Sequence, residues 1–507
     1  MSEARDVIES LGSAAVSRRG FLLALTALGL AACSTGTGTG TTSSATNSAT
    51  TSSSTAGTRN PLVIPPLLTG TTFDLSLAAN SVQYQSGAKT PTYGYNGADF
   101  WGPTLLMKKG EQVTLNVKND LSEETTTHWH GMHIPAEMDG GPHQVIAAGE
   151  TWSPQFEVKN NAATYWYHPH MHETTLKQLT LGAGGFIIVE DDEELALALP
   201  RTYGVDDIPL VLTSRRFTST NEFDMTTAYG DYLLANGVMN AGVSLPAQMV
   251  RLRILNAETE RYYNVALDGR TFYVIGTDGG LLNAPLPVTQ VRMSPGERYE
   301  IVIDLSKDPV GTQLSLQALN SGMPFGAGGS EPATTGEFGS LLNNTTFELL
   351  SITVAAATDK AVTSLPAALA SHTLWTEADA TNSRTIAITD EGPGTPFTFD
   401  NKGYSMATIN QTVKLDTVEK WTITNDFVFG HSFHIHDVQF AIVSRSTGDV
   451  ADYEKGWKDT FAILPNESVT FVAKFDDFAS DMHPFMYHCH MANHEDGGLM
   501  GQFLVVA

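Results

Sequence analysis

Histidines spaced two residues apart constrain this chain more than any other feature of its sequence. Five His-x-His pairs occur, at positions 128/130, 168/170, 170/172, 434/436 and 488/490. Fifteen histidines in 507 residues would give about 0.4 such pairs by chance. Residues two apart on a β-strand point to the same side, so each pair offers two imidazoles to one point. The pattern predicts a site for several metal ions, built on strands from both ends of the chain.

The last of these pairs encloses a cysteine, in His488-Cys489-His490, and His494 follows shortly after it. If this stretch is a strand, Cys489 points to one side and its two neighbours to the other. A thiolate with a nearby imidazole suits a copper site that exchanges single electrons. The flanking imidazoles suit a second metal centre directly behind that site.

Short alternating apolar runs, separated by Gly, Pro and Asn, begin near residue 60 and predict β-sandwiches. Helices are expected only at residues 193–198 and 364–374. Breaks near residues 190–210 and 355–390 divide the folded part into three blocks of ordinary domain size. No histidine or cysteine lies between His172 and His372. We therefore interpret the middle block as a spacer or as a wall of the substrate site.

The first 33 residues have the features of an export signal. Paired arginines at 18 and 19 precede an apolar run, 21–32, that is too short to span a bilayer. This segment resembles a twin-arginine signal, and Leu-Ala-Ala-Cys at its end resembles a bacterial lipobox, which implies a lipid on Cys33. Residues 34–58 form a Ser/Thr/Gly tether. We predict an exported lipoprotein of the cell envelope, on the periplasmic or extracellular face of the membrane.

Charge and cysteine content narrow the possible partners. The net charge of −26 argues against nucleic acid as a partner. There are only two cysteines, Cys33 and Cys489, and both have a more specific use than a disulfide. We therefore interpret Cys489 as a metal-bound thiol, and we expect a monomer.

Four segments resemble the copper-binding motifs of the three-domain multicopper oxidases, in the same order and spacing: THWHGMHIP, WYHPHMH, GHSFHIHDVQF and HCHMANHE. The similarity covers about residues 60–507. It implies an all-β protein of three cupredoxin-like Greek-key β-sandwich domains, with copper in domain 3 and at the interface of domains 1 and 3. The expected segments are a signal at 1–33, a linker at 34–58, and domains at 59–200, 201–360 and 361–507.

The resemblance implies four copper ions. His128 and His434 would hold the type 2 ion, and His431, Cys489 and His494 the type 1 ion. The coupled type 3 pair would be held by six histidines: His130, His168, His170, His436, His488 and His490. This assignment agrees with the soft thiolate site inferred above from the residues alone.

Carboxylates are expected close to the copper ions. Asp139 and Glu495 match residues that deliver protons in relatives, and reduction of O2 to water consumes four protons. Asp437, directly after His436, is expected to orient a ligand imidazole.

The position that matches the axial ligand of the type 1 ion is Leu499, where most bacterial metal-oxidising relatives have methionine. The neighbouring Met500 would face away on a strand, although a bulge would bring it to the ion. A type 1 site without a thioether is expected to have a raised reduction potential.

The remaining histidines and some methionines have weaker signals. His133, His143 and His172 are expected beside the cluster without binding metal, and His372 is expected in solvent. Three methionines and a histidine surround the last motif: Met482, His483, Met486 and Met491. They either fill the core or guide Cu(I), which favours thioethers.

Three functions are consistent with this sequence. The first is oxidation of Cu(I) or Fe(II) with O2 as acceptor, in copper tolerance. The second is a laccase activity on phenols and aromatic amines. The third is copper binding or electron transfer without turnover. The complete ligand set argues against the third, because storage or shuttling does not require an O2-reducing cluster.

Overall fold

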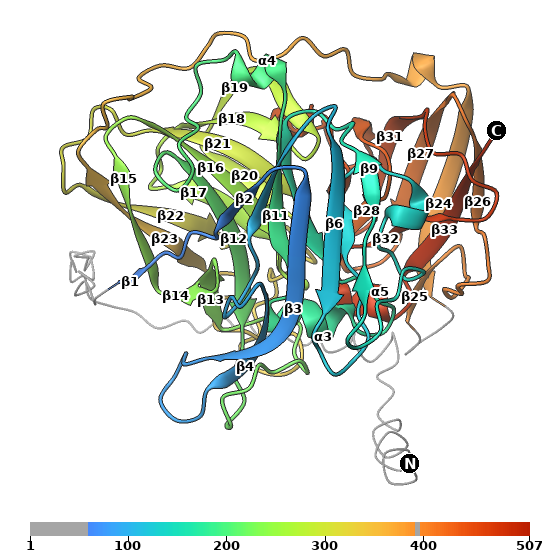
Figure 1. Cartoon of the computed structure of the whole chain (residues 1–507), viewed down its shortest axis with the longest axis horizontal. Helices are drawn as coiled ribbons and strands as arrows, with labels where there is room; N and C mark the ends of the chain where they lie inside the picture. Colours follow the sequence, from blue (N-terminus) through green and yellow to red (C-terminus); the bar gives the residue numbers. More distant parts are fainter. Residues whose placement is uncertain (1–58, 391–395) are drawn as a thin grey trace, which may run out of the picture. The chain divides into compact units, whose positions relative to one another are not determined.

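The computed structural model describes residues 59–390 and 396–507. The predicted signal, Cys33 and the linker lie outside these ranges, and those predictions stay untested. The described residues form six β-sheets with a few short helices (Figure 1), which confirms the all-β fold. None of the helices in these ranges is both long and apolar enough to cross a bilayer.

The first block contains two five-stranded sheets. One has the order β2 (Leu67–Thr69), β5 (Thr104–Lys108), β11 (Gly185–Glu190), β10 (Ala163–His168) and β7 (His128–His130). The other joins β4 (Thr90–Tyr95), β3 (Thr72–Val82), β6 (Gln112–Asn119) and β8 (Thr151–Trp152), and β9 (Gln155–Glu157) also pairs with β6. Alternate residues of β6, from Val113 to Val117, pack with Trp129 and Tyr165 in the core. This is the period of two that the sequence showed.

The middle block contains a seven-stranded and a six-stranded sheet. The first has the order β14 (Val238–Met239), β13 (Tyr232–Ala235), β12 (Asp207–Arg215), β16 (Met249–Asn256), β21 (Arg298–Asp304), β18 (Phe272–Thr277) and β19 (Gly280–Val288). The second has the order β1 (Asn60–Pro61), β15 (Ala241–Pro246), β23 (Thr346–Ala355), β22 (Gln313–Leu319), β17 (Tyr263–Leu267) and β20 (Gln290–Met293). The first described strand, β1, thus pairs with a strand of the middle block. The domain boundaries at 200 and 360 stay predictions.

The third block again contains two five-stranded sheets. One has the order β25 (Phe397–Phe399), β24 (Asn382–Asp390), β27 (Thr417–Asn425), β31 (Glu467–Phe475) and β29 (Phe440–Arg445). The other has the order β26 (Gln411–Lys414), β33 (Met500–Val506), β32 (Phe485–Cys489), β28 (His431–Ile435) and β30 (Thr460–Ile463). Trp421, Phe433 and Phe471 fill the core between them, and Cys489 belongs to the same buried cluster.

The helices are short: α3 (Thr175–Leu181), α4 (Asp192–Leu195), α5 (Ala492–Asp496), and the 3₁₀ turns η1 (Ala136–Met138), η2 (Glu377–Asp379) and η3 (Asp452–Glu454). The expected helix at 193–198 corresponds to α4, which Asp191 caps. The helix expected at 364–374 is wrong. There the N–H of Leu369 donates to Asn283 O, and that of His372 donates to Asn283 Oδ1, so these groups bond to another strand.

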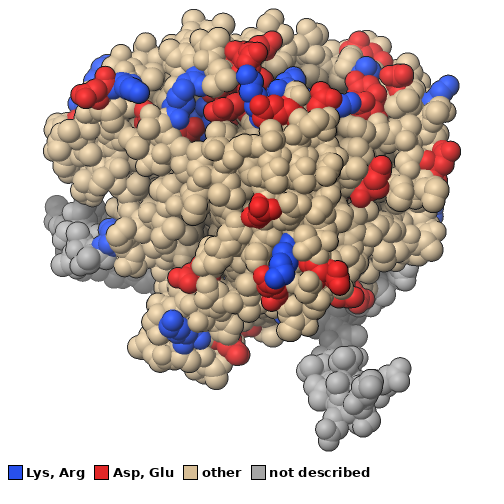
Figure 2. Space-filling model, in the orientation of Figure 1, with Lys and Arg blue, Asp and Glu red and all other residues tan. Residues whose placement is uncertain are grey.

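Charged side chains are unevenly placed on the face shown in Figure 2. Lysines, arginines and acidic residues gather together along its upper edge, near α4 and β19, and most of the remaining face is uncharged. Because the two signs are mixed on this face, it has no separate basic patch of the kind that binds nucleic acid.

Candidate metal centre

Two pairs of antiparallel strands carry the histidines predicted for the cluster. β7 pairs with β10 in the first block, and His128 lies opposite His168. β28 pairs with β32 in the third block, and His434 lies opposite His488. The other four lie on these strands or directly after them: His130, His170, His436 and His490. The two blocks therefore contribute matching halves of one site.

All eight histidines meet in a single buried cluster. His170 Nε2 lies 3.2 Å from Nε2 of both His436 and His488. The ring nitrogens of three overlapping sets lie within 4.8 Å of one another: His128/His434/His436, His128/His130/His168 and His170/His436/His488. Each of the eight side chains is at most 2% exposed.

Some ring nitrogens of this cluster have no hydrogen-bond partner among the described residues, namely Nε2 of His128, His168 and His434. A buried polar atom without a partner costs roughly 1–3 kcal/mol. Burial lowers the pKa of His168 and His434 well below the ordinary value, so both rings are neutral and each has a free lone pair. Neutral imidazoles with free lone pairs are metal ligands, and the cluster therefore fits metal ions.

The opposite ring nitrogens hold these imidazoles in place. Nδ1 of His128 donates to the Asp139 carbonyl at 2.9 Å, and Nδ1 of His434 donates to the Asp459 carbonyl at 2.9 Å. A ring that donates through Nδ1 must carry its lone pair on Nε2. Backbone carbonyls thus fix the tautomer that leaves Nε2 free, as is usual for histidines that bind metals.

A second donor set lies on the other face of β32. Cys489 Sγ is 3.7 Å from His431 Nδ1 and 3.6 Å from His494 Nδ1, and the two imidazole nitrogens are 3.1 Å apart. His494 lies on α5 and is partly exposed, whereas Cys489 is buried. Burial raises the pKa of the Cys489 thiol to about 12. A bound metal ion reverses this, because it deprotonates a coordinating thiol.

Apolar residues surround this second donor set. The ring of Phe397 lies 4.8 Å from that of His431 and 4.9 Å from that of His494. Leu499 is fully buried in the same core cluster as Cys489, and its carbonyl accepts the Cys489 N–H. Met500 pairs with His488 on the neighbouring strand and lies outside that cluster. Leu499 therefore belongs to the apolar surroundings of Cys489, and Met500 does not.

Each predicted proton-delivering carboxylate bridges two histidines of the cluster. Asp139 Oδ2 accepts a hydrogen bond from His436 Nδ1 at 2.6 Å, and its Oδ1 lies 3.3 Å from His128 Nδ1. Glu495 Oε1 lies 3.1 Å from His170 Nδ1 and Oε2 lies 3.2 Å from His488 Nδ1.

The neighbouring imidazoles stabilise Glu495 as an anion. Burial alone would raise the pKa of Glu495, but His170 and His488 lower it well below its usual range. The hydroxyl of Thr175, on α3, donates a further bond to Glu495 Oε1 at 2.7 Å. This carboxylate therefore holds hydrogen bonds from both blocks of the cluster.

The prediction that Asp437 orients a ligand imidazole is wrong, because its contact is with His133, which is not one of the predicted ligands. Its carboxylate lies 3.1 Å from Nδ1 of His133, while Asp139 makes the bond to His436. Because Asp437 has a positive φ of 72°, its side chain is directed differently from that of a regular strand residue.

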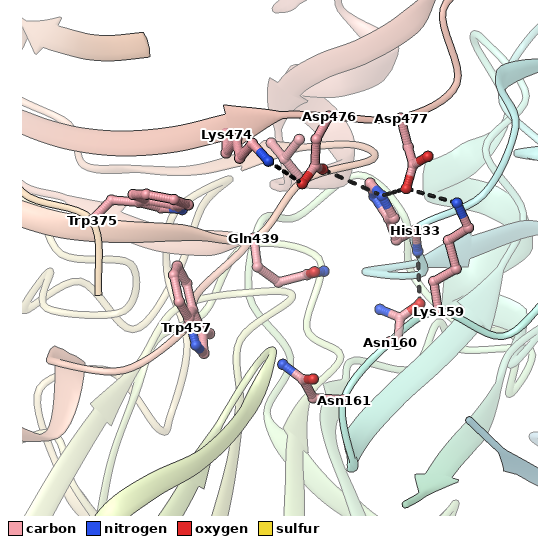
Figure 3. A pocket seen from close by; sticks show the side chains of 11 residues that line it. His133, Lys159, Asn160, Asn161, Trp375, Gln439, Trp457, Lys474, Asp476 and Asp477 are labelled. Atoms are coloured by element: carbon pink, nitrogen blue, oxygen red, sulfur yellow. Dashed lines mark hydrogen bonds and ion pairs between the residues drawn. The ribbon is translucent and has the colours of Figure 1, made fainter. Parts of the chain in front are cut away.

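His133 lies in the wall of a polar cavity of about 330 Å³ (Figure 3). In that view His133, Lys159 and Asp477 lie on one side and the indoles of Trp375 and Trp457 on the other. His133 Nε2 lies 3.1 Å from Asp477 Oδ2. Burial acts to lower the pKa of His133, but Asp437 and Asp477 raise it to about 10. The imidazole is therefore charged at neutral pH.

The sequence analysis missed a buried ion pair, Arg298–Asp459, that contacts two histidines of the cluster. Arg298, on β21 of the middle block, makes a bidentate contact with Asp459, with Nη1–Oδ1 at 2.7 Å and Nη2–Oδ2 at 2.6 Å. Asp459 Oδ1 in turn lies 3.2 Å from Nε2 of His130, and the Asp459 carbonyl accepts from His434. Arg298 and Asp459 are both fully buried.

Other residues of the middle block also contact both donor sets. The Tyr262 hydroxyl donates to the carbonyl of His431 at 2.6 Å. Gly296 has a φ of +88°, and a Cβ at that position would lie 2.8 Å from the His490 ring. Through these contacts the middle block holds ligand residues of both donor sets in position. The interpretation as a spacer or substrate wall was incomplete, because a search for ligand types cannot detect residues that act through other residues.

The other histidines make their ring contacts with residues outside the two donor sets. The ring of His172 packs against Tyr404, that of His143 contacts Gln502, and that of His372 lies near Trp457. Met491 is buried beside Cys489, as a core residue. Met482 and His483 are exposed and precede β32, whereas Cys489 is its last residue. They therefore do not surround the thiolate site.

Comparisons with known proteins agree with this geometry. Three family models, each described as multicopper oxidase, match residues 77–194, 212–315 and 373–507. A curated multicopper oxidase of Staphylococcus aureus is 31% identical over 443 residues, which cover 85% of this chain and 88% of the relative. The chain belongs to the multicopper oxidase family.

Two further relatives are described in different terms. A solved laccase-like multicopper oxidase, CueO from Ochrobactrum sp., has a TM-score of 0.78 and 34% identity, and the match covers 88% of this chain and all of that one. The cell division protein FtsP of Edwardsiella tarda is 32% identical over 462 residues, or 89% of this chain and 93% of the relative. Membership in the family makes the chain a copper-dependent oxidase with cupredoxin-like β-sandwiches. Multicopper oxidases take electrons from metal ions or phenols and pass them to O2.

Proposed function

We propose that this multicopper oxidase couples four one-electron oxidations of an aromatic donor to the reduction of one O2 to two water molecules. The observation that supports this most is β32, which carries Cys489 on one face and His488 on the other. Two donor sets are thus joined by consecutive covalent bonds. Four electrons from the donor and four protons from solvent balance the reduction of O2.

The copper assignment follows the predicted one. His431, Cys489 and His494 would hold the type 1 ion, and His128 and His434 would hold the type 2 ion. The type 3 pair would be held by the other six histidines: His130, His168, His170, His436, His488 and His490. When bound, copper would supply a one-electron acceptor at the thiolate set and a site for O2 reduction at the cluster.

The chain itself supplies orientation and protons. Backbone carbonyls and the Asp459 carboxylate hold the imidazoles at fixed angles, so little reorganisation is needed during turnover. Asp139 and Glu495 lie within hydrogen-bonding distance of different cluster imidazoles, His436 and His170. These two carboxylates deliver protons to the oxygen atoms that are being reduced.

An aromatic donor is favoured by the surface beside His494. Phe397 contacts Phe427 at 5.1 Å, and Phe338 stacks on Phe429 at 5.7 Å. Phe325 is 55% exposed and Val428 is 42% exposed. We call these residues the aromatic rim: Phe325, Phe338, Phe397, Phe427, Val428 and Phe429. The rim offers ring faces to a phenol or aromatic amine, and the Ochrobactrum laccase-like relative oxidises lignin model compounds.

Oxidation of Cu(I) or Fe(II), in copper tolerance, is the second candidate. Acidic side chains lie beneath the same surface, where Glu260 and Glu331 influence each other. Burial raises the pKa of Glu260 to about 8, so at neutral pH this group is mostly uncharged and attracts a cation weakly. The exposed methionine, Met482, lies away from the thiolate site. Both observations place metal donors second.

A role without turnover is the third candidate, and the similarity to FtsP, a cell division protein, is its support. The complete set of eleven predicted ligands argues against it. Buried imidazoles with unpartnered nitrogens are costly to maintain, and a protein that needs only the fold would not need them.

Oxygen uptake by the copper-loaded protein separates the three candidates. We expect uptake with a methoxyphenol to exceed that with Cu(I), and uptake with both to vanish in Cys489→Ser. The rim variant Phe338→Ala, which removes the ring stacked on Phe429, is expected to change the KM for the phenol and leave the Cu(I) rate unchanged. Faster uptake with Cu(I) would favour the metal oxidase. No uptake with any donor, despite four bound copper ions, would refute the oxidase proposal.

A further inference from the structure

A second hollow on the surface contains metal-binding side chains that the proposed reaction does not use. It measures about 470 Å³ and is formed by two stretches that are far apart in the sequence. Glu137, residues 143–145 and Trp152 form one side, and residues 482–484 form the other. Four of the lining side chains can bind a metal ion: Glu137, His143, Met482 and His483.

These four side chains are exposed, and the exposure of Met482 is unusual for a methionine. Met482 is 80% exposed, although methionine is among the residues most often buried. The backbone that presents it is ordered by Ser480, whose hydroxyl oxygen accepts the N–H groups of Met482 at 3.2 Å and His483 at 2.9 Å. A fixed turn thus holds a thioether and an imidazole out at the hollow.

The tautomer of His143 is fixed in the form that binds metal. The side-chain amide of Gln502 donates to three backbone carbonyls, those of Ser405, Met406 and Thr408. Its oxygen must therefore point the other way, toward His143 Nε2, with which it is in hydrogen-bond contact. Because an amide oxygen can only accept, Nε2 carries the proton and Nδ1 carries the lone pair. In histidines that bind metals, the other ring nitrogen usually donates a hydrogen bond to an oxygen in this way.

The donor set favours copper over the hard divalent ions Mg²⁺ and Ca²⁺, and the thioether further favours Cu(I). Two imidazoles and a thioether are soft or intermediate ligands, which suit copper and are poor ligands for Mg²⁺ and Ca²⁺. One carboxylate, Glu137, completes a set of four that can hold either Cu(I) or Cu(II). The exposed Met482 and His483 side chains can rotate toward a shared ion.

The hollow lies on the loop that reaches the trinuclear cluster. Asp139, whose carboxylate bonds His436, lies between Glu137 and His143 in the sequence. A Cβ on Gly141, in the same loop, would lie 3.6 Å from Met486 Cγ and 3.8 Å from Asp139 Oδ2. The loop therefore has donor side chains at its surface and a cluster contact at its inner end.

We propose that Glu137, His143, Met482 and His483 form a surface copper site, separate from the four catalytic ions, that acquires copper for the cluster. The ion binds at the hollow and is passed inward along the loop of Asp139. No electron transfer or bond cleavage is involved. The binding part of this proposal holds whether or not the protein proves to be an oxidase.

Metal binding tests the site directly. The protein with its full copper complement is titrated with Ag(I), a redox-inert substitute for Cu(I), and with Cu(II), and bound metal is counted after desalting. We expect one additional equivalent of each ion in the wild type and none in His143→Ala/His483→Ala. Met482→Leu, which keeps the side-chain size, is expected to weaken Ag(I) binding about tenfold and Cu(II) binding much less. Matched controls are His372→Ala and Met225→Leu, which lie outside the hollow and should bind like the wild type.

The acquisition role has a separate readout. Metal-free protein is supplied with limiting copper, and the type 2 electron paramagnetic resonance signal is followed with time. We expect the double variant to fill more slowly than the wild type and to reach the same final copper content. An equal metal count in all variants would refute the site, and an equal filling rate would refute its acquisition role. Neither result depends on oxidase turnover.

Discussion

Replacing Arg298 by glutamine removes the cation that neutralises Asp459 beneath the cluster. The two charged groups are fully buried and share two hydrogen bonds of 2.6–2.7 Å. Breaking a buried pair by removing one partner costs about 3–5 kcal/mol, because the other charge is left uncompensated. We expect a loss of this size in the free energy of unfolding of the metal-free protein, measured by chemical denaturation.

The same substitution should weaken the trinuclear cluster selectively. Asp459 contacts His130 and His434, and loss of such an orienting contact typically lowers metal affinity about 10–100-fold. We expect lower copper content at the cluster, read from the type 2 resonance signal. The blue absorption of the Cys489 site should be unchanged, because neither residue touches that donor set.

Two variants sharpen the test. Arg298→Lys keeps the charge and loses the bidentate geometry, so it should fall between the wild type and Arg298→Gln. In Arg298→Gln/Asp459→Asn both charges are absent, and the double variant should be more stable than the sum of the single losses predicts. The reasoning is wrong if Arg298→Gln lies within about 0.5 kcal/mol of the wild type and all copper sites fill normally.

Four further predictions follow from the site and its surroundings. Leu499→Met should lower the reduction potential of the blue copper site by adding a thioether donor; spectroelectrochemistry that finds the potential unchanged or raised would contradict this. Glu495→Gln should slow O2 reduction roughly 100-fold while the donor still reduces the blue copper in stopped flow; an unchanged turnover rate would remove the residue from proton delivery. His133, whose pKa is raised to about 10, should stabilise the metal-free protein fully below pH 6.5 and lose that contribution as the pH rises toward 10. The destabilisation by His133→Gln in thermal unfolding should therefore be larger at pH 6 than at pH 10, and equal losses at both would show that the charge does not matter. Finally, Cys33→Ala should abolish labelling of the protein by a radioactive fatty acid in cells, and persistent labelling would refute the predicted lipid anchor.

The sequence predicted those features that depend on local periodicity. Side chains alternate along a strand, so His488 and Cys489 had to point to opposite faces of β32. The His-x-His spacing likewise placed two imidazoles on one side of each cluster strand. The all-β fold followed from the same short alternating runs.

Features that depend on contacts between distant segments could not be predicted in this way. Arg298 and Asp459 lie on different blocks, and nothing in the residues around either one identifies the other as its partner. The helix expected at 364–374 failed for the same reason, since Asn283 provides hydrogen bonds that a local pattern does not reveal. The sequence analysis placed Met482 around the last copper-binding motif, and only the fold shows that it precedes β32, whose last residue is Cys489.

The buried ion pair also explains how the site can exist before copper arrives. Each cluster nitrogen without a hydrogen-bond partner opposes folding by about 1–3 kcal/mol. Burial keeps the imidazoles neutral, so they do not repel one another as cations. Arg298 with Asp459, and Asp139 and Glu495 with the imidazoles they contact, hold the donor atoms in place meanwhile. Copper that binds only the folded chain then adds stability in proportion to the logarithm of its free concentration over its Kd. Chelation of copper should therefore lower the unfolding temperature, and by a larger amount where Arg298 is intact, because only a preformed cluster binds copper tightly.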